Sequence, residues 1–102
     1  MAGVGKLLKQ AQKMQKRIEE AQAELASTVV EVAHGGGAVK IAINGHSEIT
    51  GLSLDPEFLK EPKDVVEATL LSALREAYAK SKDVNQERMK SATEGFGLPG
   101  LL

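Results

Sequence analysis

The side chains with the clearest chemistry are basic and lie near the start of the chain. Residues 1–18 contain no acidic side chain, and their basic side chains are Lys6, Lys9, Lys13, Lys16 and Arg17. We call these five residues the basic stripe. Steps of three and four residues place the lysines along one flank of a helix. Such a row of cations, about 17 Å long, would bind phosphates over roughly five base pairs of duplex DNA.

A solvated helix surface is the simpler interpretation of any lysine-rich helix. Solvated faces usually carry both signs, often as stabilising Glu and Lys pairs four residues apart, and like charges at this spacing repel. No acid occurs here before Glu19. An anionic partner would relieve this repulsion, so the pattern favours a binding surface.

The net charge of the chain hides this local excess. The sequence has 13 basic and 14 acidic residues, for a net charge of −1, and the basic stripe supplies five of the cations. The rest of the chain therefore carries −6. Salt screens charges beyond roughly 8 Å, so the distant acids weaken phosphate binding at the stripe very little.

A second group of cations falls near the C-terminus among acidic residues. It consists of Lys80, Lys82, Arg88 and Lys90, with Asp83, Glu87 and Glu94 in the same stretch. A mixed face usually serves solubility. We therefore expect these residues to contribute less to DNA binding than the basic stripe.

The other reactive residue types predict no catalysis. The chain has no Cys, which excludes a disulfide framework, a thiolate zinc site and a cysteine nucleophile. Residues 35–37 are three glycines, but no Lys-Ser/Thr follows them, so they predict a hairpin turn and not a phosphate loop. His34 and His46 are expected as solvated residues beside turns. We predict no enzyme activity, cofactor, metal, small-molecule substrate or membrane partner, and a cytoplasmic location.

The elements that must position the basic stripe follow from hydrophobic periodicity. From about Val4 to Ala26, apolar residues at steps of three and four predict a helix with one apolar seam, formed by Val4, Leu7, Ala11, Met14, Ile18, Ala21 and Leu25. Alternation between Thr28 and Leu54 predicts three antiparallel strands. Their turns would lie at residues 35–37 and 44–45, where positive φ is expected, with a bulge near Gly51.

A second long helix completes the predicted domain. One helical turn is expected from Asp55 through Leu59, followed by a helix from residue 63 or 64 to about Thr93 that Gly95 caps. The fold class is α+β, an α-β-β-β-α order with two long helices. We expect one domain over residues 1–94 and a flexible tail over residues 95–102.

The lengths of the helices also predict an assembly. A compact domain of this size is roughly 33 Å across, whereas a 30-residue helix is about 45 Å long. The helices must therefore overhang and leave apolar surface exposed. A second copy related by a two-fold axis would cover this surface, so we predict a homodimer.

Three segments resemble the YbaB/EbfC family of bacterial nucleoid-associated proteins. They are Leu8-Lys9-Gln10-Ala11-Gln12-Lys13-Met14-Gln15, Val39-Lys40-Ile41-Ala42-Ile43-Asn44-Gly45 and Leu54-Asp55-Pro56. The resemblance covers essentially the whole chain. It implies a tight α-β-β-β-α dimer whose projecting helices bind double-stranded DNA like tweezers, in the nucleoid. It also implies that the basic stripe and the stretch from Lys80 to Lys90 contact DNA.

Two functions follow from these observations. The first is an architectural protein that binds duplex DNA through its phosphates. The alternative is a protein-protein interaction module whose seam and helix ends hold a partner without direct DNA binding.

Overall fold

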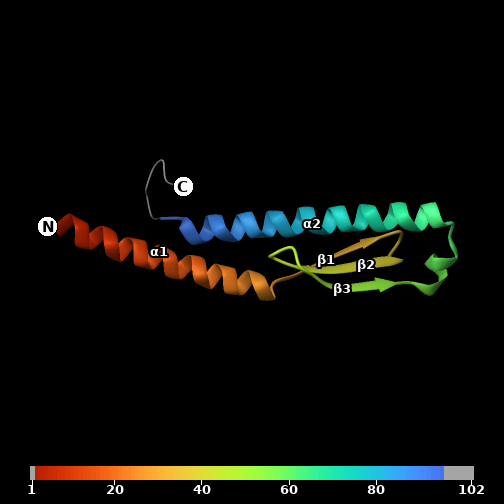
Figure 1. The fold of residues 1–102 in the computed structure, drawn as a ribbon, viewed down its shortest axis with the longest axis horizontal. Helices are drawn as coiled ribbons and strands as arrows, with labels where there is room; N and C mark the ends of the chain where they lie inside the picture. The colour runs from red at the N-terminus through yellow and green to blue at the C-terminus, as the bar shows by residue number, and fades with distance from the viewer. Residues whose placement is uncertain (1, 96–102) are drawn as a thin grey trace.

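The computed structural model describes residues 2–95. The elements in chain order are α1 (Ala2–Ser27), β1 (Val29–His34), β2 (Val39–Asn44), β3 (Ile49–Leu54), the 3-10 helix η1 (Pro56–Lys60) and α2 (Lys63–Thr93). This is the predicted α-β-β-β-α order (Figure 1). Except for Gly95, the predicted tail lies outside the described residues.

The three strands form one antiparallel sheet in the order β1-β2-β3. Ala42 pairs with Gly51 and Ile43 pairs with Ile49, so Thr50 is left over between the two pairs. This irregularity is the predicted bulge, and it interrupts the alternation of β3.

The two hairpin turns reach their geometry in different ways. Gly35, Gly36 and Gly37 all have positive φ, at 63°, 69° and 94°, as expected for a glycine turn. The prediction of positive φ at Asn44 and Gly45 was wrong. In the second turn the positive φ of 61° belongs to Ser47, and Gly45 is needed for a different reason that is described below.

The core lies between one face of the sheet and the first half of α2. Its buried residues are Val32, Val39, Ile41, Ile43, Phe58, Ala73 and Ala77. The two alanines are on α2, and their small side chains let the helix lie close to β1 and β2. A core with one aromatic residue is what the aliphatic composition predicts.

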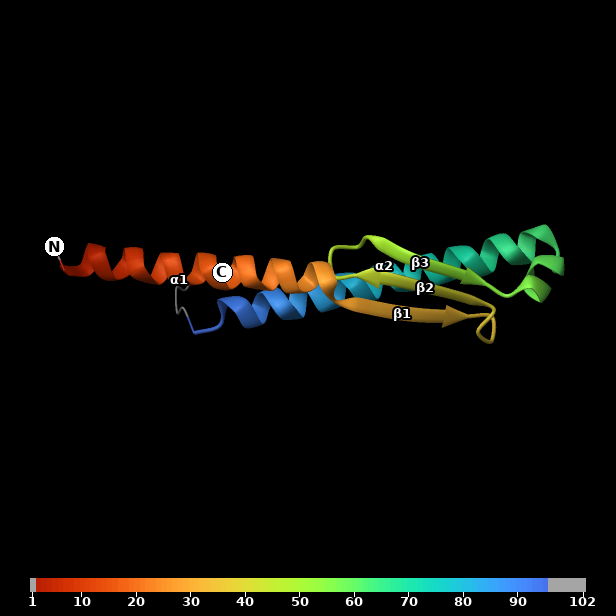
Figure 2. The same ribbon diagram turned by 90° about the horizontal axis from the view of Figure 1, so that it is seen from below.

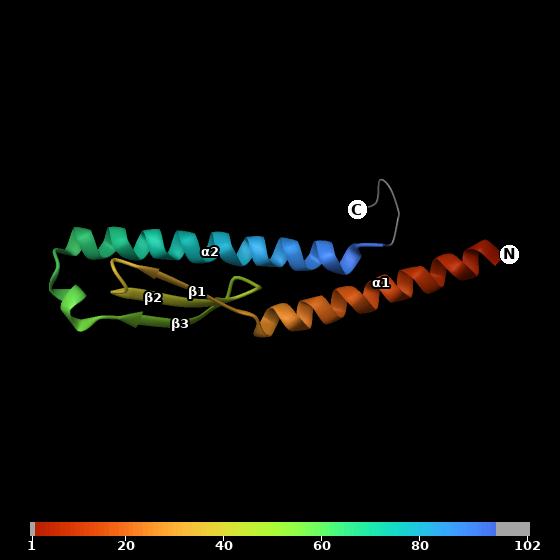
Figure 3. The same ribbon diagram turned by 180° about the vertical axis from the view of Figure 1, so that it is seen from behind.

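The same side of α2 continues beyond the sheet and packs against α1. Ser81 and Ala92 in the second half of α2 are buried, as are Ala21 and Leu25 on α1. Figures 1 and 3 show the sheet and α1 one after the other along this side of α2. One helix therefore supports both the sheet and the basic helix.

The molecule is elongated. It measures 71 × 23 × 16 Å, and its Cα radius of gyration is 19.8 Å, against about 13 Å for a compact domain of this length. The extra length comes from α1, which extends well past α2 (Figure 2). Within residues 2–95, no helix is long and apolar enough to span a membrane.

Candidate nucleic-acid interface

The first half of α1 is an arm that projects beyond α2. Arg17 Nη1 donates a hydrogen bond to the carbonyl oxygen of Glu94 at 3.4 Å, directly after the end of α2. The residues before Arg17 therefore lie past the C-terminal end of α2 (Figure 2). We call residues 2–16 the arm. The predicted seam continues onto the arm without cover, since Val4 and Leu7 are 53% and 57% exposed.

The lysines of the basic stripe are exposed along the arm. None of Lys6, Lys9, Lys13 and Lys16 forms an ion pair with any residue between 2 and 95. Ala21 and Leu25 show which side of α1 faces α2. At about 100° per residue, the four lysines lie about 80° to 160° around the helix from that side. The lysines therefore lie on an exposed flank of α1, outside its contact with α2.

The stripe ends where the support from α2 begins. Its last cation, Arg17, is bonded to the end of α2. Glu20 and Glu24 then continue the same flank, and Glu24 Oε2 accepts a hydrogen bond from Arg88 Nε at 2.6 Å. The unbalanced positive charge is thus confined to the arm and its base.

The basic residues of α2 are dispersed and partly paired. Lys80 Nζ lies 3.0 Å from Glu76 Oε1, and Arg88 is engaged with Glu24 on α1. Lys82 and Lys90 are exposed. Lys82 lies about 200° around the helix from Lys80, and Lys90 lies about 200° from Arg88. The four cations therefore do not form a row. The structure brings together the stripe on α1 but not the second group of cations.

Both histidines have defined partners, so the expectation of solvated histidines was wrong. His34, at the end of β1, is half-buried and pairs with Glu76 on α2. His46 Nε2 donates to the carbonyl oxygen of Gln22 at 2.8 Å. The sequence shows each histidine beside a turn but not what packs over that turn.

The local electrostatics of α2 centre on Glu76. Hydrogen bonds first from Lys80 and then from His34 lower the pKa of the Glu76 carboxyl below its ordinary value of 4.5. This carboxylate therefore stays charged and holds Lys80 on the side of α2 that faces β1. In the described part of the chain, no group of three His, Asp or Glu side chains could hold a metal ion.

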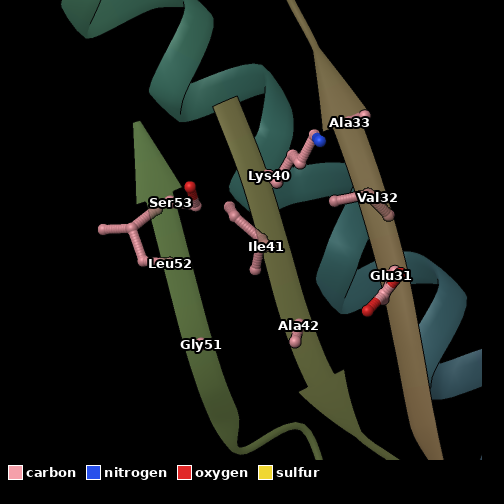
Figure 4. Close-up of a pocket in the computed structure, with 9 residues that line it drawn as sticks. All are labelled: Glu31, Val32, Ala33, Lys40, Ile41, Ala42, Gly51, Leu52 and Ser53. Carbon is pink, nitrogen blue, oxygen red and sulfur yellow. The ribbon is translucent and has the colours of Figure 1, made fainter. Parts of the chain in front are cut away.

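The sheet has a second face that sequence analysis did not single out. Strand alternation places small and charged side chains opposite the core: Glu31, Ala33, Lys40, Ala42, Gly51 and Ser53. They line a shallow concavity of about 620 Å³, and α2 passes behind the sheet in this view (Figure 4). We call this surface the open face. Its sequence signal is the run of small residues at alternate positions.

The open face and the lysines of the basic stripe both lie outside the contacts with α2. The sheet and α1 both pack on one side of α2 (Figure 1). The open face is the side of the sheet turned away from α2, and the lysines lie on an exposed flank of α1. Both surfaces are therefore left uncovered by α2.

The family comparison agrees with this arrangement. The model of the YbaB/EbfC DNA-binding family matches residues 1–96. The chain belongs to the YbaB/EbfC family. A nucleoid-associated protein of Gloeobacter violaceus is 40% identical over 92 residues, which cover 90% of this chain and 83% of that protein.

Two further relatives of this YbaB/EbfC protein support the assignment. A nucleoid-associated protein of Hahella chejuensis is 38% identical over 96 residues, covering 94% of this chain and 89% of that protein. The crystal structure of an uncharacterized protein of Helicobacter pylori superposes with a TM-score of 0.66 at 26% identity, covering 76% of this chain and 90% of that chain. The family is one of DNA-binding proteins and not a family of enzymes.

Proposed function

We propose that this protein is a cytoplasmic, nucleoid-associated protein that binds duplex DNA as a homodimer, mainly through phosphate contacts. Its role would be nucleoid organisation or gene regulation, without a catalytic step, metal, cofactor, small-molecule substrate or membrane partner. The observation that carries the proposal is a projecting helical arm with four exposed lysines, to which no carboxylate of residues 2–95 is bonded. The names of the relatives from Gloeobacter and Hahella agree with it.

The contacts are assigned to Lys6, Lys9, Lys13, Lys16 and Arg17. A row of ammonium groups on a helix follows the DNA backbone and releases the counterions condensed there. Such contacts position a protein on DNA without reading bases. Few aromatic side chains are available to stack on unpaired bases, since the chain has two Phe, one Tyr and no Trp, so duplex is favoured over single strands.

A secondary contribution is assigned to Lys80, Lys82, Arg88 and Lys90. Arg88 and Lys80 would have to leave Glu24 and Glu76 to reach a phosphate. Lys82 and Lys90 are available but lie about 12 Å apart along α2. The proposal therefore gives α2 the smaller share of the affinity.

The open face, which a single chain leaves uncovered, supports the proposed homodimer. The open face carries the backbone of three strands, covered by small side chains and by Glu31 and Lys40, which have opposite charges. A second copy packed there across a two-fold axis would bury this surface and match each charge with its opposite. With the two-fold axis along the length of the molecule, both arms would lie at the same end, and one duplex could lie between them.

The alternative, a protein-protein interaction module, is favoured by one observation. Val4, Leu7 and Leu8 are exposed at the tip of the arm, at 53%, 57% and 59%. Apolar side chains in this position suit a helical protein partner. Such a partner would make affinity depend on the seam and not on the lysines.

Gel-shift titrations of a duplex at several salt concentrations test the proposal. If about six phosphates are contacted per dimer, the logarithm of affinity falls against the logarithm of salt with a slope near −5. Changing Lys9, Lys13 and Lys16 to Gln keeps helix propensity and should flatten the slope on every duplex sequence alike. The matched triple change of Lys80, Lys82 and Lys90 to Gln should have the smaller effect.

The results separate the two functions. An equal or larger loss from the α2 variant would move the binding surface to α2. If neither triple variant lost affinity, the proposal of lysine contacts would be wrong and the interaction module would be favoured. Sedimentation at micromolar concentration should give a mass near twice 10.8 kDa, and a monomer would contradict the proposed assembly.

A further inference from the structure

The turn between β2 and β3 caps the C-terminal end of α1. A helix leaves its last four carbonyl groups without partners inside the helix. Two donors from residues 44–46 reach carbonyls of this group, and a third reaches a carbonyl one turn earlier. Asn44 Nδ2 donates to Ala26 O at 3.2 Å and His46 Nε2 to Gln22 O at 2.8 Å. The backbone N–H of Gly45 donates to Leu25 O at 2.9 Å.

Gly45 is needed because the turn and the helix are in close contact. A Cβ atom at this position would lie 2.5 Å from Leu25 Cδ2 and 2.9 Å from both Leu25 Cβ and Leu25 O. Leu25 is itself fully packed, at 1% exposure. Any side chain at residue 45 would therefore push the end of α1 away from the turn.

The same turn is also bonded to α2. Ser81 is fully buried, and its Oγ donates to Asn44 O at 2.7 Å and accepts from the backbone N–H of Ser47 at 3.0 Å. Asn85 Nδ2 donates to Gly45 O at 2.8 Å. Residues 44–48 thus connect the base of α1 to the middle of α2, while a single residue, Thr28, joins α1 to β1 along the chain.

We propose that residues 44–48 form a joint that aims the basic stripe, with Asn44, Gly45 and His46 as positioning residues for DNA binding. The seam and surface hydrogen bonds of Arg17 and Arg88 hold α1 on α2. Apolar packing is non-directional, and contacts between long exposed side chains are weak, so this contact permits rolling and sliding. Hydrogen bonds are directional, so the joint fixes the rotation of α1 about its own axis and its register along α2.

The rotation of α1 decides where the lysines point. One residue of helix corresponds to about 100° of rotation, so a shift of one residue in register would turn the lysines about 100° around the axis of α1. An arm with a loosened joint would still carry all its charges. It would have to be ordered when it binds DNA, and affinity would fall because of this cost.

Two variants loosen the joint and two serve as controls. Gly45→Ala introduces the clash with Leu25, and the double change His46→Ala with Asn85→Ala removes one hydrogen bond to each helix. His46→Gln keeps a donor for Gln22 O. Phe58→Leu removes packing in the core beside η1, far from the joint, and controls for general loss of stability.

The first measurement needs no DNA. Because the chain has no native Cys, spin labels can be attached to Gln12→Cys on the arm and Ala79→Cys on α2, with labelled protein diluted into unlabelled protein. The distance distribution should be narrow in the parent, His46→Gln and Phe58→Leu proteins. It should broaden or shift in Gly45→Ala and in the double variant.

The second measurement is the salt dependence of DNA affinity, and it rests on the proposed function. Both loosening variants should lose about tenfold in affinity with an unchanged slope against salt, since the number of phosphate contacts stays the same. If Gly45→Ala does not fold, the double variant of His46→Ala with Asn85→Ala alone tests the inference.

Three results would overturn the inference. The first is a distance distribution in the folded loosening variants that is as narrow as in the parent protein. The second is a broadening in Phe58→Leu equal to that in the loosening variants. The third is a flattened salt slope in the loosening variants, which would make the turn itself a DNA contact. If the parent protein failed to bind duplex DNA, the proposed function would fall, whereas the distance distributions would still test whether the joint sets the direction of the arm.

Discussion

At the residue scale, position in the fold determines what each charged or small side chain can do. Lys6 and Lys80 are the same residue type, yet Lys6 is unpaired in the described structure and Lys80 is bound to Glu76. Gly45 and Gly36 are both turn glycines, but only Gly36 has positive φ, whereas Gly45 allows contact with Leu25. Residue type alone therefore does not give the role.

Glu76 provides a prediction at this scale. Its folded-state pKa is lowered by Lys80 and His34, so its contribution to stability is present above the unfolded pKa and is lost as pH falls through the folded pKa. Glu76→Gln should lower the free energy of unfolding at pH 7 but make little difference at pH 3. Urea denaturation at both pH values measures this, with the exposed Glu67→Gln on the same helix as control. A difference that persisted at pH 3 would contradict the electrostatic explanation.

At the element scale, the apolar seam of α1 is packed against the rest of the protein in its second half and exposed to solvent near its start. The seam is buried near Leu25 and Ala21, half-buried at Ile18 and Met14, and exposed at Leu7. The change occurs because α2 ends near Arg17. A continuous seam in the sequence therefore does not imply continuous burial.

This gradient can be tested by truncating the seam at its two ends. Leu25→Ala should destabilise the protein by about 2–5 kcal/mol, because it leaves a cavity against α2 and the turn. Leu7→Ala should change stability by no more than about 0.5 kcal/mol in the same chemical denaturation assay. A large loss from Leu7→Ala would show that a partner or another part of the chain covers the tip.

At the scale of the whole molecule, α2 supports both the sheet and α1 and leaves the open face and the lysines uncovered. The two surfaces are separated by the length of the sheet and by the joint. In the proposed dimer, a two-fold contact through the open faces would bring two arms to one duplex. Dimerisation and DNA binding would then be linked.

A bulky charge in the centre of the open face tests this link. Ala42→Arg should convert the dimer to a monomer in sedimentation, because the long side chain would fill the concavity that the second copy is proposed to cover. The monomer should bind DNA more weakly, with a slope against salt about half that of the parent, since one arm contacts about half as many phosphates. Ser72→Arg, exposed on α2 and outside the open face, is the control. A dimeric Ala42→Arg protein would place the interface elsewhere.

The sequence by itself determined the elements and the charge pattern. The helix bounds, the three strands, the bulge and the basic stripe depend on neighbours within a few residues, and periodicity records such local preferences directly. The resemblance to the YbaB/EbfC family drew on the same local segments, and the match over residues 1–96 confirmed it.

Only the tertiary structure decided which surfaces are covered and which charges are paired. The contact of Gly45 with Leu25 and the pairs of Glu76 with His34 and of Glu24 with Arg88 all join residues far apart in the chain. These depend on how rigid helices and strands pack, and packing is set by shape complementarity across the whole core. No local pattern in the sequence encodes it.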